Sequence, residues 1–522
     1  MKRELQLKTL HETAQWDVLI IGGGASGLGT AVDAAGRGFK TVLFEGVDFA
    51  KGTSSRSTKL VHGGVRYLAH GEVSLVKEAL KERGLLAKNA NHLFRNQTFI
   101  IPGYKWWEGY YYAIGLTLYD WLSKKRSLGK SRLLRKNETI RKLPTLKPEK
   151  LKGGVSYQDG QFDDARLAVN LAQTAIENGA TVLNHMKVTA LLKDEAQTVT
   201  GVKVKDTETG TTYEVNARVV INATGIFTNK ILKMDNPEQK KTVVPSQGIH
   251  LVLDSSFLNS TYALMIPKTS DGRVLFAIPW KGKTVVGTTD TPVKKPKLEP
   301  EALEKEIEFI LKTVAQYLTK VPVRSDVLSV FAGLRPLAAP KKEDLSTKEV
   351  SRSHKINVSD TGLITIIGGK WTTYRKMAED IIDKAIEVHQ LPQRSCVTET
   401  LSIHGNLSSP AEVPAHPLAR YGSDIPALET LRTQQPHFSR KVHPSYSYTL
   451  AEVVWSIREE MARTVEDILA RRVRLLFLDA RAAIEAAPLV AKTLAEELNK
   501  DETWAKAQET GFIKTAKKYI LT

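Results

Sequence analysis

The stretch that decides the fold is Asp17-Val-Leu-Ile-Ile-Gly-Gly-Gly-Ala-Ser-Gly-Leu-Gly29. Its apolar part, residues 18–21, is uncharged and rich in branched side chains, which predicts a buried parallel strand. Gly22, Gly24 and Gly27 follow at the G-x-G-x-x-G spacing, and the next residues can continue as a helix. Glycines in such a turn let the backbone approach a pyrophosphate, which then binds the amides at the helix N-terminus. The stretch therefore predicts a dinucleotide-binding turn.

An acidic residue ends the second predicted strand, Thr41-Val-Leu-Phe-Glu45. Glu45 follows Gly27 by 18 residues, and at that place a carboxylate accepts a hydrogen bond from a ribose hydroxyl and repels a 2′-phosphate. The glycine fingerprint alone also fits an ordinary glycine-rich turn. Strand, turn, helix, second strand and terminal acid together favour the dinucleotide site.

The composition is that of an ordinary globular protein, with 42% hydrophobic and 25% charged residues. A chain of 522 residues is long enough for two or three domains. The single cysteine, Cys396, excludes an intrachain disulfide and a cysteine-based metal cluster, and it suits a reducing compartment. We predict no metal site. Residues 1–15 are polar, without the apolar core of a signal peptide, and no apolar run is long enough to predict a transmembrane helix.

The formal net charge of +18 indicates an anionic partner. Nucleic acid is the least favoured, because no helix-turn-helix, zinc-finger or RNA-binding aromatic motif is present. Residues 101–150 combine many aromatic residues with 12 Lys/Arg against 4 Asp/Glu, a local excess of +8. This mixture suits the headgroup region of an anionic membrane. Aromatic core residues beside a solvated basic face are the alternative.

A long polar segment follows the second strand, and we call residues 48–68 the serine loop. It is dense in hydroxyls and glycines, and its few apolar residues indicate that it is held in place. Its amides and hydroxyls fit a polyphosphate and a ring system. An exposed, flexible serine-rich loop is the alternative.

The remaining patterns predict an α/β protein. Its parts are a Rossmann-like domain with a parallel sheet, an antiparallel-sheet domain that covers the cofactor and the substrate, and a C-terminal helical domain. We expect a polar, loosely docked lead-in at 1–15, the two interleaved domains within 16–400 (substrate portions about 80–160 and 242–330), and helices in 401–522. The strand at 218–221 runs into Asn222-Ala-Thr-Gly225, and a return strand packed beside the first favours FAD over NAD. Further predicted strands are 181–183, 188–192, 199–205 and 211–215, and further predicted helices are 72–88, 298–318, 452–472, 489–499 and one that opens at Asp163.

Taken together, the motifs resemble one family, the FAD-linked, membrane-peripheral glycerol-3-phosphate dehydrogenases that pass electrons to quinone. The matching runs cover nearly the whole chain. They are Ile-Gly-Gly-Gly-Ala-Ser-Gly27, Gly52-Thr-Ser-Ser-Arg-Ser-Thr-Lys-Leu-Val-His-Gly-Gly-Val-Arg-Tyr-Leu68, Asp163-Asp-Ala-Arg166, Asn222-Ala-Thr-Gly225, Ile278-Pro-Trp280, Gly287-Thr-Thr-Asp290, Gly333-Leu-Arg-Pro336, Gly368-Gly-Lys-Trp-Thr-Thr-Tyr-Arg375 and Ala470-Arg-Arg-Val-Arg-Leu-Leu-Phe-Leu478.

The resemblance implies oxidation of sn-glycerol 3-phosphate to dihydroxyacetone phosphate, with a hydride passing from C2 to the flavin N5. It implies substrate contacts from Arg66, Tyr67, His250, Arg335, Lys370 and Thr373, of which Arg66, His250, Arg335 and Lys370 are the candidate catalytic residues. His250 is the leading general base, because a histidine near its ordinary pKa accepts a proton at neutral pH, and His62 is its rival.

For FAD, the resemblance implies a set of contacts spread over most of these motifs. They are Gly22, Gly24, Ala25, Ser26, Gly27, Glu45, Thr53, Ser54, Ser55, Lys59, Leu60, His62, Gly63, Gly64, Val188, Ala223, Thr224, Gly225, Gly333, Gly369, Lys370, Trp371 and Thr372.

The expected partners are the substrate, a membrane quinone and an anionic membrane surface, and the expected location is the cytoplasmic face of the cell membrane. The sequence leaves a homo-oligomer open. It also leaves open an oxidase of the same fold that uses O2. An amino-acid or amine oxidoreductase, or a flavin-binding protein without turnover, fits the motifs less well.

Overall fold

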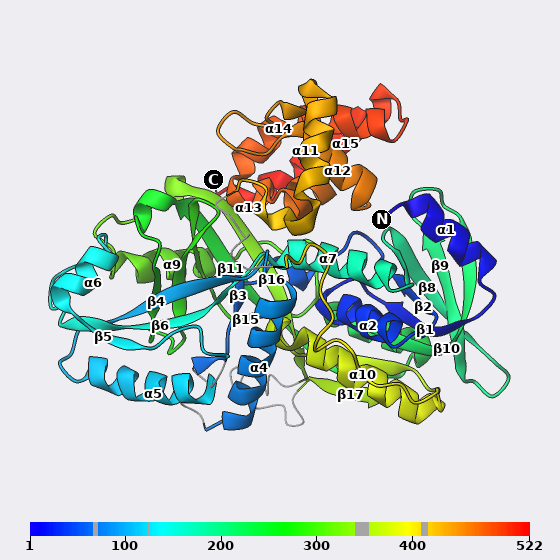
Figure 1. The fold of residues 1–522 in the computed structure, drawn as a ribbon, viewed down its shortest axis with the longest axis horizontal. Coiled ribbons are helices and arrows are strands. Elements are labelled where there is room, and N and C mark those ends of the chain that lie inside the picture. Colours follow the sequence, from blue (N-terminus) through cyan, green and yellow to red (C-terminus); the bar gives the residue numbers. More distant parts are fainter. Residues whose placement is uncertain (66–70, 124–125, 340–353, 409–415, 522) are drawn as a thin grey trace.

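The computed structural model describes residues 1–65, 71–123, 126–339, 354–408 and 416–521 (Figure 1). Two sheet-containing lobes lie side by side, and the C-terminal helices lie across their upper edge in the view of Figure 1. One lobe holds a sheet with a parallel centre, and the other holds a mostly antiparallel sheet. The predicted fold class is confirmed.

The first sheet has the order β17-β18-β10-β1-β2-β7, with β9 and β8 attached through β10. Strands β18, β10, β1, β2 and β7 run parallel, and β17 is an antiparallel edge strand. The strand bounds are β1 Trp16–Ile21, β2 Thr41–Phe44, β7 Thr181–Leu183, β8 Met186–Lys193, β9 Val199–Asp206, β10 Thr212–Asn222, β17 Lys355–Val358 and β18 Ile364–Ile367.

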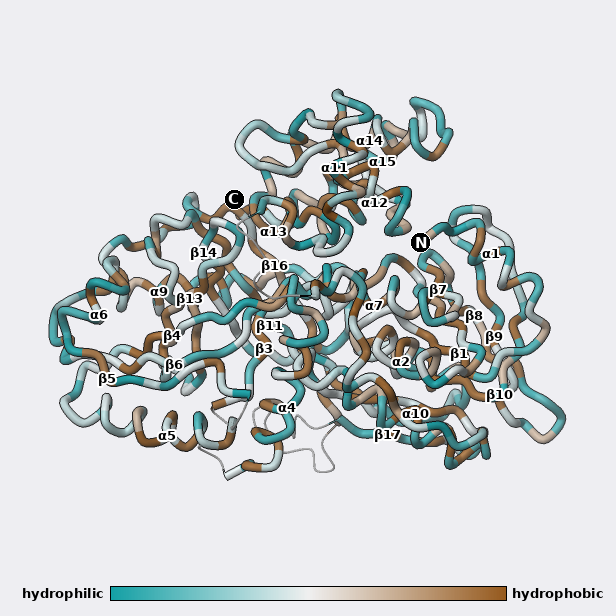
Figure 2. Tube along the Cα trace, viewed as in Figure 1, coloured by the Kyte–Doolittle hydropathy of each residue, from teal (hydrophilic) through white to brown (hydrophobic). Residues whose placement is uncertain are grey.

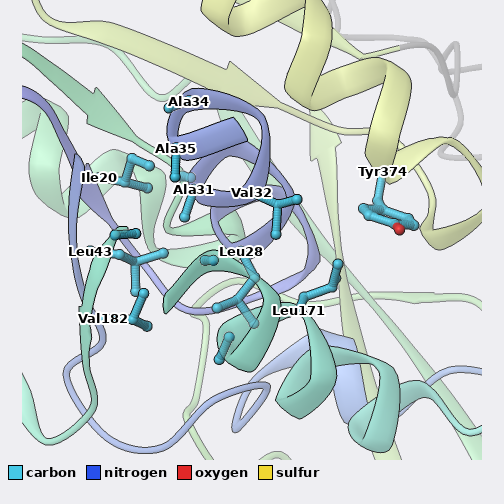
Figure 3. Close-up of a cluster of buried hydrophobic side chains, with 14 of the residues drawn as sticks. Ile20, Leu28, Ala31, Val32, Ala34, Ala35, Leu43, Leu171, Val182 and Tyr374 are labelled. Atoms are coloured by element: carbon cyan, nitrogen blue, oxygen red, sulfur yellow. The ribbon is translucent and has the colours of Figure 1, made fainter. Parts of the chain in front are cut away.

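Three helices pack on this sheet, namely α2 (Ala25–Gly36), α7 (Asp164–Glu177) and α10 (Tyr374–His389). Small residues let α2 approach α10 closely, since a Cβ at Gly29 would lie 2.9 Å from the Tyr374 ring. Figure 3 shows Leu28, Val32 and Tyr374 in the apolar core beside these helices. Burial of such side chains stabilises the fold by about 25 cal/mol per Å² of apolar surface.

Strand β10 is one long element where the sequence predicts two strands, 211–215 and 218–221. Its first half, from Thr212 to Asn216, pairs with β9 in an antiparallel register. Its second half, from Ala217 to Asn222, pairs with β1 in a parallel register. The backbone stays extended while the partner changes, so Asn216 and Ala217, between the two runs, do not break the strand. The predicted pairing of the return strand with the first strand is confirmed.

The second sheet has the order β15-β11-β14-β13-β12-β4-β6-β3, with β16 paired to β11 and β5 paired to β6. Its pairs are antiparallel except for β12 and β4, which are parallel. The strand bounds are β3 Leu60–Val61, β4 Arg95–Gly103, β5 Arg132–Arg135, β6 Gly153–Gln161, β11 Val243–Asp254, β12 Ala263–Ile266, β13 Leu275–Trp280, β14 Lys283–Gly287, β15 Thr291–Pro292 and β16 Val327–Ala338. The long pairing of β11 with β16 forms the wall nearest the first lobe.

Helices flank the second sheet, and one of them leaves apolar side chains uncovered. They are α4 Val73–Asn89, α5 Glu108–Ser123, α6 Lys136–Lys142 and α9 Glu304–Ala315, while the short α8 (Thr228–Asp235) follows β10. Helix α5 lies at the outer edge of the lobe and carries several hydrophobic residues (Figure 2). It buries Leu116, Tyr119 and Leu122 but exposes a second set of aromatic and aliphatic residues. None of the helices in the described part of the chain combines the length and the apolar character needed to cross a bilayer.

The C-terminal region is helical, as predicted, and shares its core with the second sheet. Phe331, Val252 and Trp280 of the sheet belong to the same apolar cluster as the C-terminal helices. The helices are α11 Ile425–Gln434, α12 Leu450–Glu459, α13 Leu475–Leu478, α14 Ala480–Glu497 and α15 Glu502–Ala516, with a π-helical turn at Asp467–Arg472. The predicted continuous helix 452–472 is wrong in that it is interrupted: α12 ends at Glu459, and the chain becomes helical again only at residues 465–472, which include the π-helical turn. There Arg471 and Arg472 both bind the buried Asp48, which directs the chain toward the first lobe.

The N-terminal residues form a docked helix, α1 (Arg3–Glu12), and the prediction of a loosely docked lead-in is wrong. Arg3 is buried, and its guanidinium donates to the Asn184 carbonyl at 2.6 Å and pairs with Asp206 at 3.2 Å. Leu10 is buried beside Trp16. The Val182 amide also donates to Gln6 Oε1 at 3.1 Å, so polar contacts hold much of this helix, and they give no apolar period in the sequence.

Candidate active site

A cavity of about 740 Å³ lies where the two sheets meet. Its walls come from the turn after β1, the ends of β2 and β10, the serine loop, strands β11 and β16, and the turn after β18. A crevice at the carboxyl ends of parallel strands is the usual ligand site of an open α/β sheet. Segments that are far apart in the sequence therefore meet at one site.

The glycine turn after β1 is closed tightly on the return strand. Gly22 has φ +112°, and a Cβ there would lie 2.8 Å from the Ala223 carbonyl oxygen. A Cβ at Gly27 would collide with the carbonyl oxygen of Gly22. The Ala25 amide, in the first turn of α2, donates to Ser54 Oγ at 2.9 Å. The turn thus leaves backbone space and helix-end amides for a pyrophosphate.

The carboxylate that ends β2 is held by the turn itself. Glu45 Oε2 accepts from the Gly23 amide at 2.7 Å, and Oε1 accepts from the Val47 amide at 2.9 Å. Burial raises the pKa of Glu45 above its usual value, although the two amides oppose the rise. Because Glu45 also lines the cavity, it is placed to bind a ribose hydroxyl.

Hydrogen bonds tie the serine loop to the far wall of the cavity, among them one from Arg56 Nη1 to the Ala332 carbonyl at 3.0 Å. Thr53 Oγ1 donates to the Leu334 carbonyl at 2.5 Å, and Trp371 Nε1 donates to the Ser54 carbonyl at 2.8 Å. The His62 amide donates to Thr372 Oγ1 at 3.3 Å. These contacts join the loop to β16 and to the turn after β18, so the three segments form one surface.

Most of the predicted cofactor residues line this cavity. They are Gly22, Gly24, Ala25, Ser26, Glu45, Thr53, Ser54, Leu60, His62, Val188, Ala223, Thr224, Gly225, Gly333, Gly369, Lys370, Trp371 and Thr372. Gly27, Ser55, Lys59, Gly63 and Gly64 do not line it. Gly27 packs on Gly22, and Gly63 packs on Tyr119 and Leu80.

Lys59 turns away from the cavity into the protein interior. Its Nζ donates to the Ser55 carbonyl and to Asp164 Oδ2, both at 2.7 Å. Burial lowers the pKa of Lys59 to about 7, and Asp164 counteracts that effect. Asp164, at the start of α7, therefore binds the serine loop from behind.

The predicted substrate residues are brought together only in part. His250, Arg335 and Lys370 line the cavity. Thr373 does not line it, and its hydroxyl donates to the Lys370 carbonyl at 3.4 Å. Arg66 and Tyr67 lie outside the described residues.

His250 is a buried ring between two strands. It stacks on Phe331 at 4.9 Å between ring centroids, and its Nε2 lies 2.9 Å from Thr58 Oγ1. Burial, followed by the Lys59 and Arg335 cations, holds the pKa of His250 well below its usual range. The expectation of a histidine near its ordinary pKa is therefore wrong, and the ring is neutral at neutral pH. Thr58 is a contact that the sequence did not single out.

Arg335 lies across the backbone of Gly248, where a Cβ would collide with its guanidinium. Its Nη2 donates to the Thr289 carbonyl at 3.0 Å and to Thr288 Oγ1 at 3.2 Å, and its Nη1 lies 3.5 Å from Asp290 Oδ1. Such contacts fix the plane of the guanidinium, which suits an oxyanion ligand. The run Gly287-Thr-Thr-Asp290 thus supports the arginine, a role that sequence alone did not indicate.

These residues fit FAD. The glycine cradle has room for a pyrophosphate because side chains are absent at Gly22 and Gly27, and the Glu45 carboxylate, a group that suits a ribose hydroxyl, lines the same cavity. Residues 17–375 match the family model "FAD dependent oxidoreductase". Fold, site and match together define an FAD-dependent oxidoreductase.

Residues 359–505 match a second family model, the C-terminal domain of alpha-glycerophosphate oxidase. The chain is 41% identical to the mitochondrial glycerol-3-phosphate dehydrogenase of Homo sapiens, over 99% of this chain and 75% of that protein. It is 41% identical to the probable mitochondrial glycerol-3-phosphate dehydrogenase of Caenorhabditis elegans, over 98% of this chain and 74% of that protein. The chain belongs to the family of FAD-dependent glycerol-3-phosphate dehydrogenases.

Solved structures agree with this assignment. The glycerol-3-phosphate dehydrogenase of Bacillus halodurans, complexed with FAD, superposes with a TM-score of 0.81 at 30% identity, covering 100% of this chain and 98% of that one. The L-alpha-glycerophosphate oxidase of Mycoplasma pneumoniae, with FAD bound, has a TM-score of 0.56 at 18% identity, over 74% of this chain and 97% of that one. The second likeness concerns the fold alone. The expectation that the cofactor is FAD is confirmed.

Proposed function

We propose that the protein oxidises sn-glycerol 3-phosphate to dihydroxyacetone phosphate and passes the electrons to a membrane quinone. The observation that carries this proposal is that His250 and Arg335, on the paired strands β11 and β16, line the same cavity as the glycine turn. A proton acceptor and an anion-binding group thus stand beside the cofactor site. FAD, when bound, supplies the acceptor, at its N5 atom, for the hydride that leaves C2 of the substrate.

Arg335 binds the phosphate dianion or the alkoxide of the substrate in this proposal. Its contacts with Thr288 and Thr289 hold the guanidinium in one plane, and a planar guanidinium binds two oxygens at once. Lys370 lines the same cavity and adds a second positive charge. Arg66 and Tyr67 belong to the pocket that the sequence predicts and lie outside the described residues, and the Thr373 hydroxyl donates to the Lys370 carbonyl.

His250 accepts the proton of the C2 hydroxyl. The neutral ring has a free lone pair at neutral pH, and the low pKa favours rapid release of the proton afterwards. His62, which also lines the cavity, is the rival base. The two histidines lie in different structural elements, since His62 belongs to the serine loop and His250 belongs to strand β11.

A membrane acceptor is supported by the second apolar face of α5. Ile114 and Trp121 of α5 are 74% and 69% exposed, and Trp106, just before the helix, is 76% exposed. Exposed aromatic and aliphatic side chains on one edge of a basic protein suit the interface of an anionic membrane. We propose that this edge contacts the cytoplasmic face of the cell membrane, where quinone is available.

An anaerobic titration tests the reaction. Glycerol 3-phosphate should bleach the oxidised flavin band of the purified protein, whereas lactate and an amino acid should not. No bleaching by glycerol 3-phosphate would refute the proposal. Reoxidation of the reduced protein by a soluble quinone, compared with air-saturated buffer, then decides between the dehydrogenase and an oxidase of the same fold.

A further inference from the structure

The His250 ring is fixed by packing on both of its faces. In the pairing of β11 with β16, His250 stands opposite Phe331, and the two rings stack with an angle of 15° between their planes. Gly287 of β14 stands on the other side, where a Cβ would collide with the His250 ring. The ring therefore keeps one orientation, and the chemistry at each nitrogen depends on what lies beside it.

Only one ring nitrogen of His250 has a hydrogen-bond partner among the described residues. Nδ1 is shielded from solvent and has no such partner there. Nε2 lies 2.9 Å from Thr58 Oγ1. Both Thr58 and His250 line the cavity. A proton that leaves a ligand in the cavity therefore reaches the ring at Nε2, where the Thr58 hydroxyl already lies.

Thr58 is itself held from both sides. The Ser57 amide and hydroxyl donate to Asp164 Oδ2 at 3.0 and 2.7 Å, and Lys59 Nζ donates to the same oxygen at 2.7 Å. Lys59 has φ +63°, which turns the chain sharply after Thr58. A threonine anchored through both neighbours presents its hydroxyl to the cavity in a defined position.

We propose that Thr58 is the proton relay between the substrate hydroxyl and His250. The inference rests on the proposed function, in which His250 is the base. The C2 hydroxyl gives its proton to Thr58 Oγ1 while Thr58 gives its own proton to His250 Nε2, which becomes imidazolium. The electron pair of the C2–H bond leaves as hydride to the flavin, so that charge and atoms balance. For this step the resting ring must carry its proton on Nδ1 and its lone pair on Nε2.

The kinetic test uses Thr58→Val, which keeps the shape and removes the hydroxyl, and Thr58→Ser, which keeps the hydroxyl. Thr493→Val is the matched control, because Thr493 of α14 also loses one hydrogen bond, 3.0 Å to the Leu489 carbonyl. Thr58→Val should slow anaerobic flavin reduction by glycerol 3-phosphate roughly 100-fold, the lower range for a lost acid–base step, with unchanged FAD content. Thr58→Ser and Thr493→Val should stay within a factor of about three of the parent, since neither loses the relay hydroxyl. A Thr58→Val protein that reduces at the parental rate would overturn the relay.

A double variant asks whether Thr58 acts through His250. If it does, Thr58→Val should add almost nothing to His250→Gln. Independent, multiplicative losses would overturn the relay. A parental rate in His250→Gln would overturn it too, because His250 would then not be the base. If glycerol 3-phosphate fails to bleach even the parent protein, the proposed function fails, and the following measurement still tests the Thr58–His250 pair.

Nitrogen-15 NMR of protein labelled at histidine gives a readout that needs no turnover. The His250 signals are those missing from His250→Gln. In the parent, the proton should reside on Nδ1, and the Nε2 signal should move in Thr58→Val but not in Thr493→Val. A parent ring protonated on Nε2 could not accept the relayed proton, and this result alone would overturn the proposal, whether or not the Thr58 variants fold.

Discussion

Arg474 Nη2 donates a hydrogen bond of 3.0 Å to Asp164 Oδ1, and both side chains are fully buried. Arg474 belongs to the C-terminal region, and Asp164 opens α7 of the first lobe. The second oxygen of Asp164 accepts from Ser57 and Lys59 of the serine loop. The C-terminal region thereby supports a wall of the cavity, although none of its described residues lines that cavity.

This contact predicts that Asp164→Asn weakens both folding and cofactor retention. The amide cannot neutralise Arg474 and Lys59, and unpairing a buried charge costs about 3–5 kcal/mol. We expect an earlier urea unfolding transition and faster FAD release, followed by flavin fluorescence. Glu308→Gln, which breaks the exposed pair with Lys312, is the control and should unfold like the parent. Equal unfolding midpoints for Asp164→Asn and the parent would mean that the pair is not needed for stability.

The sequence predicted the part of the fold that local patterns encode. Residues 18–21 are a buried strand, Gly22 and Gly27 have no room for a side chain, and the return strand ends at Asn222 beside Ile21. The two strands are encoded by runs of branched residues, and the tight turn is encoded by glycines at positions where a close contact leaves no room for a side chain. The cofactor assignment depended on the same residues.

The contacts that set the chemistry were not predictable, because their partners are distant in sequence. Thr58 and His250 are 192 residues apart, and Lys59 and Arg474 share two acceptors, Asp164 and the Ser55 carbonyl. The low pKa of His250 comes from burial and from the neighbouring cations, which appear only when β11, β16 and the loop assemble. Motif spacing singled out residues that line the cavity, such as His250 and Arg335, but not their protonation states.

His404 predicts a pH-dependent contribution to stability. Its Nδ1 lies 2.5 Å from Glu177 Oε1 and its Nε2 lies 2.8 Å from Asp424 Oδ2, so it joins α7 to the C-terminal region. Burial would lower the pKa of His404, but the Asp424 and Glu177 hydrogen bonds outweigh it and raise the pKa to about 9. The folded pKa lies above the unfolded value of about 6.5, so the stabilisation is fully present below pH 6.5 and is lost as the pH rises through 9.

His404→Gln should therefore be less stable than the parent at pH 6, by about 1–3 kcal/mol, and the difference should shrink toward pH 10. Urea unfolding at several pH values measures it. His437→Gln is the control, because His437 makes no ion pair among the described residues. The difference in unfolding free energy between this variant and the parent should not shrink between pH 6 and pH 10. If the difference in unfolding free energy between the parent and His404→Gln grows as the pH rises, the pKa of His404 is not raised by folding.

Arg335→Ala should separate substrate binding from cofactor binding. The variant loses charge-assisted hydrogen bonds to the substrate phosphate or alkoxide, each worth about 1.5–3 kcal/mol, so the glycerol 3-phosphate concentration for half-maximal flavin reduction should rise about 10- to 100-fold. FAD content, measured from the absorbance ratio of flavin to protein, should change little. Arg432→Ala, in α11, is the control for the loss of one arginine. Parallel loss of FAD and of substrate affinity would make Arg335 a structural residue.

The exposed face of α5 predicts reversible vesicle binding. Ile114→Asp places a carboxylate at the centre of this face, where burial of the isoleucine would contribute about 2 kcal/mol and the new charge is repelled by anionic lipid. Co-sedimentation with vesicles that contain phosphatidylglycerol should fall by about tenfold or more. Neutralising Lys124, Lys125 and Arg126, a basic cluster that follows the helix, should weaken binding most at low salt; the first two lie outside the described residues.

Val323→Asp supplies the matched control, because Val323 is exposed and lies outside α5. It should sediment with vesicles like the parent, and both aspartate variants should keep flavin reduction by glycerol 3-phosphate. Since the contact is proposed to bring the protein to quinone, Ile114→Asp should lose activity with vesicle-embedded quinone while retaining it with a soluble acceptor. If Ile114→Asp and Val323→Asp sediment equally with vesicles, the membrane contact lies elsewhere. The exposed apolar face of α5 would then contribute nothing to lipid binding.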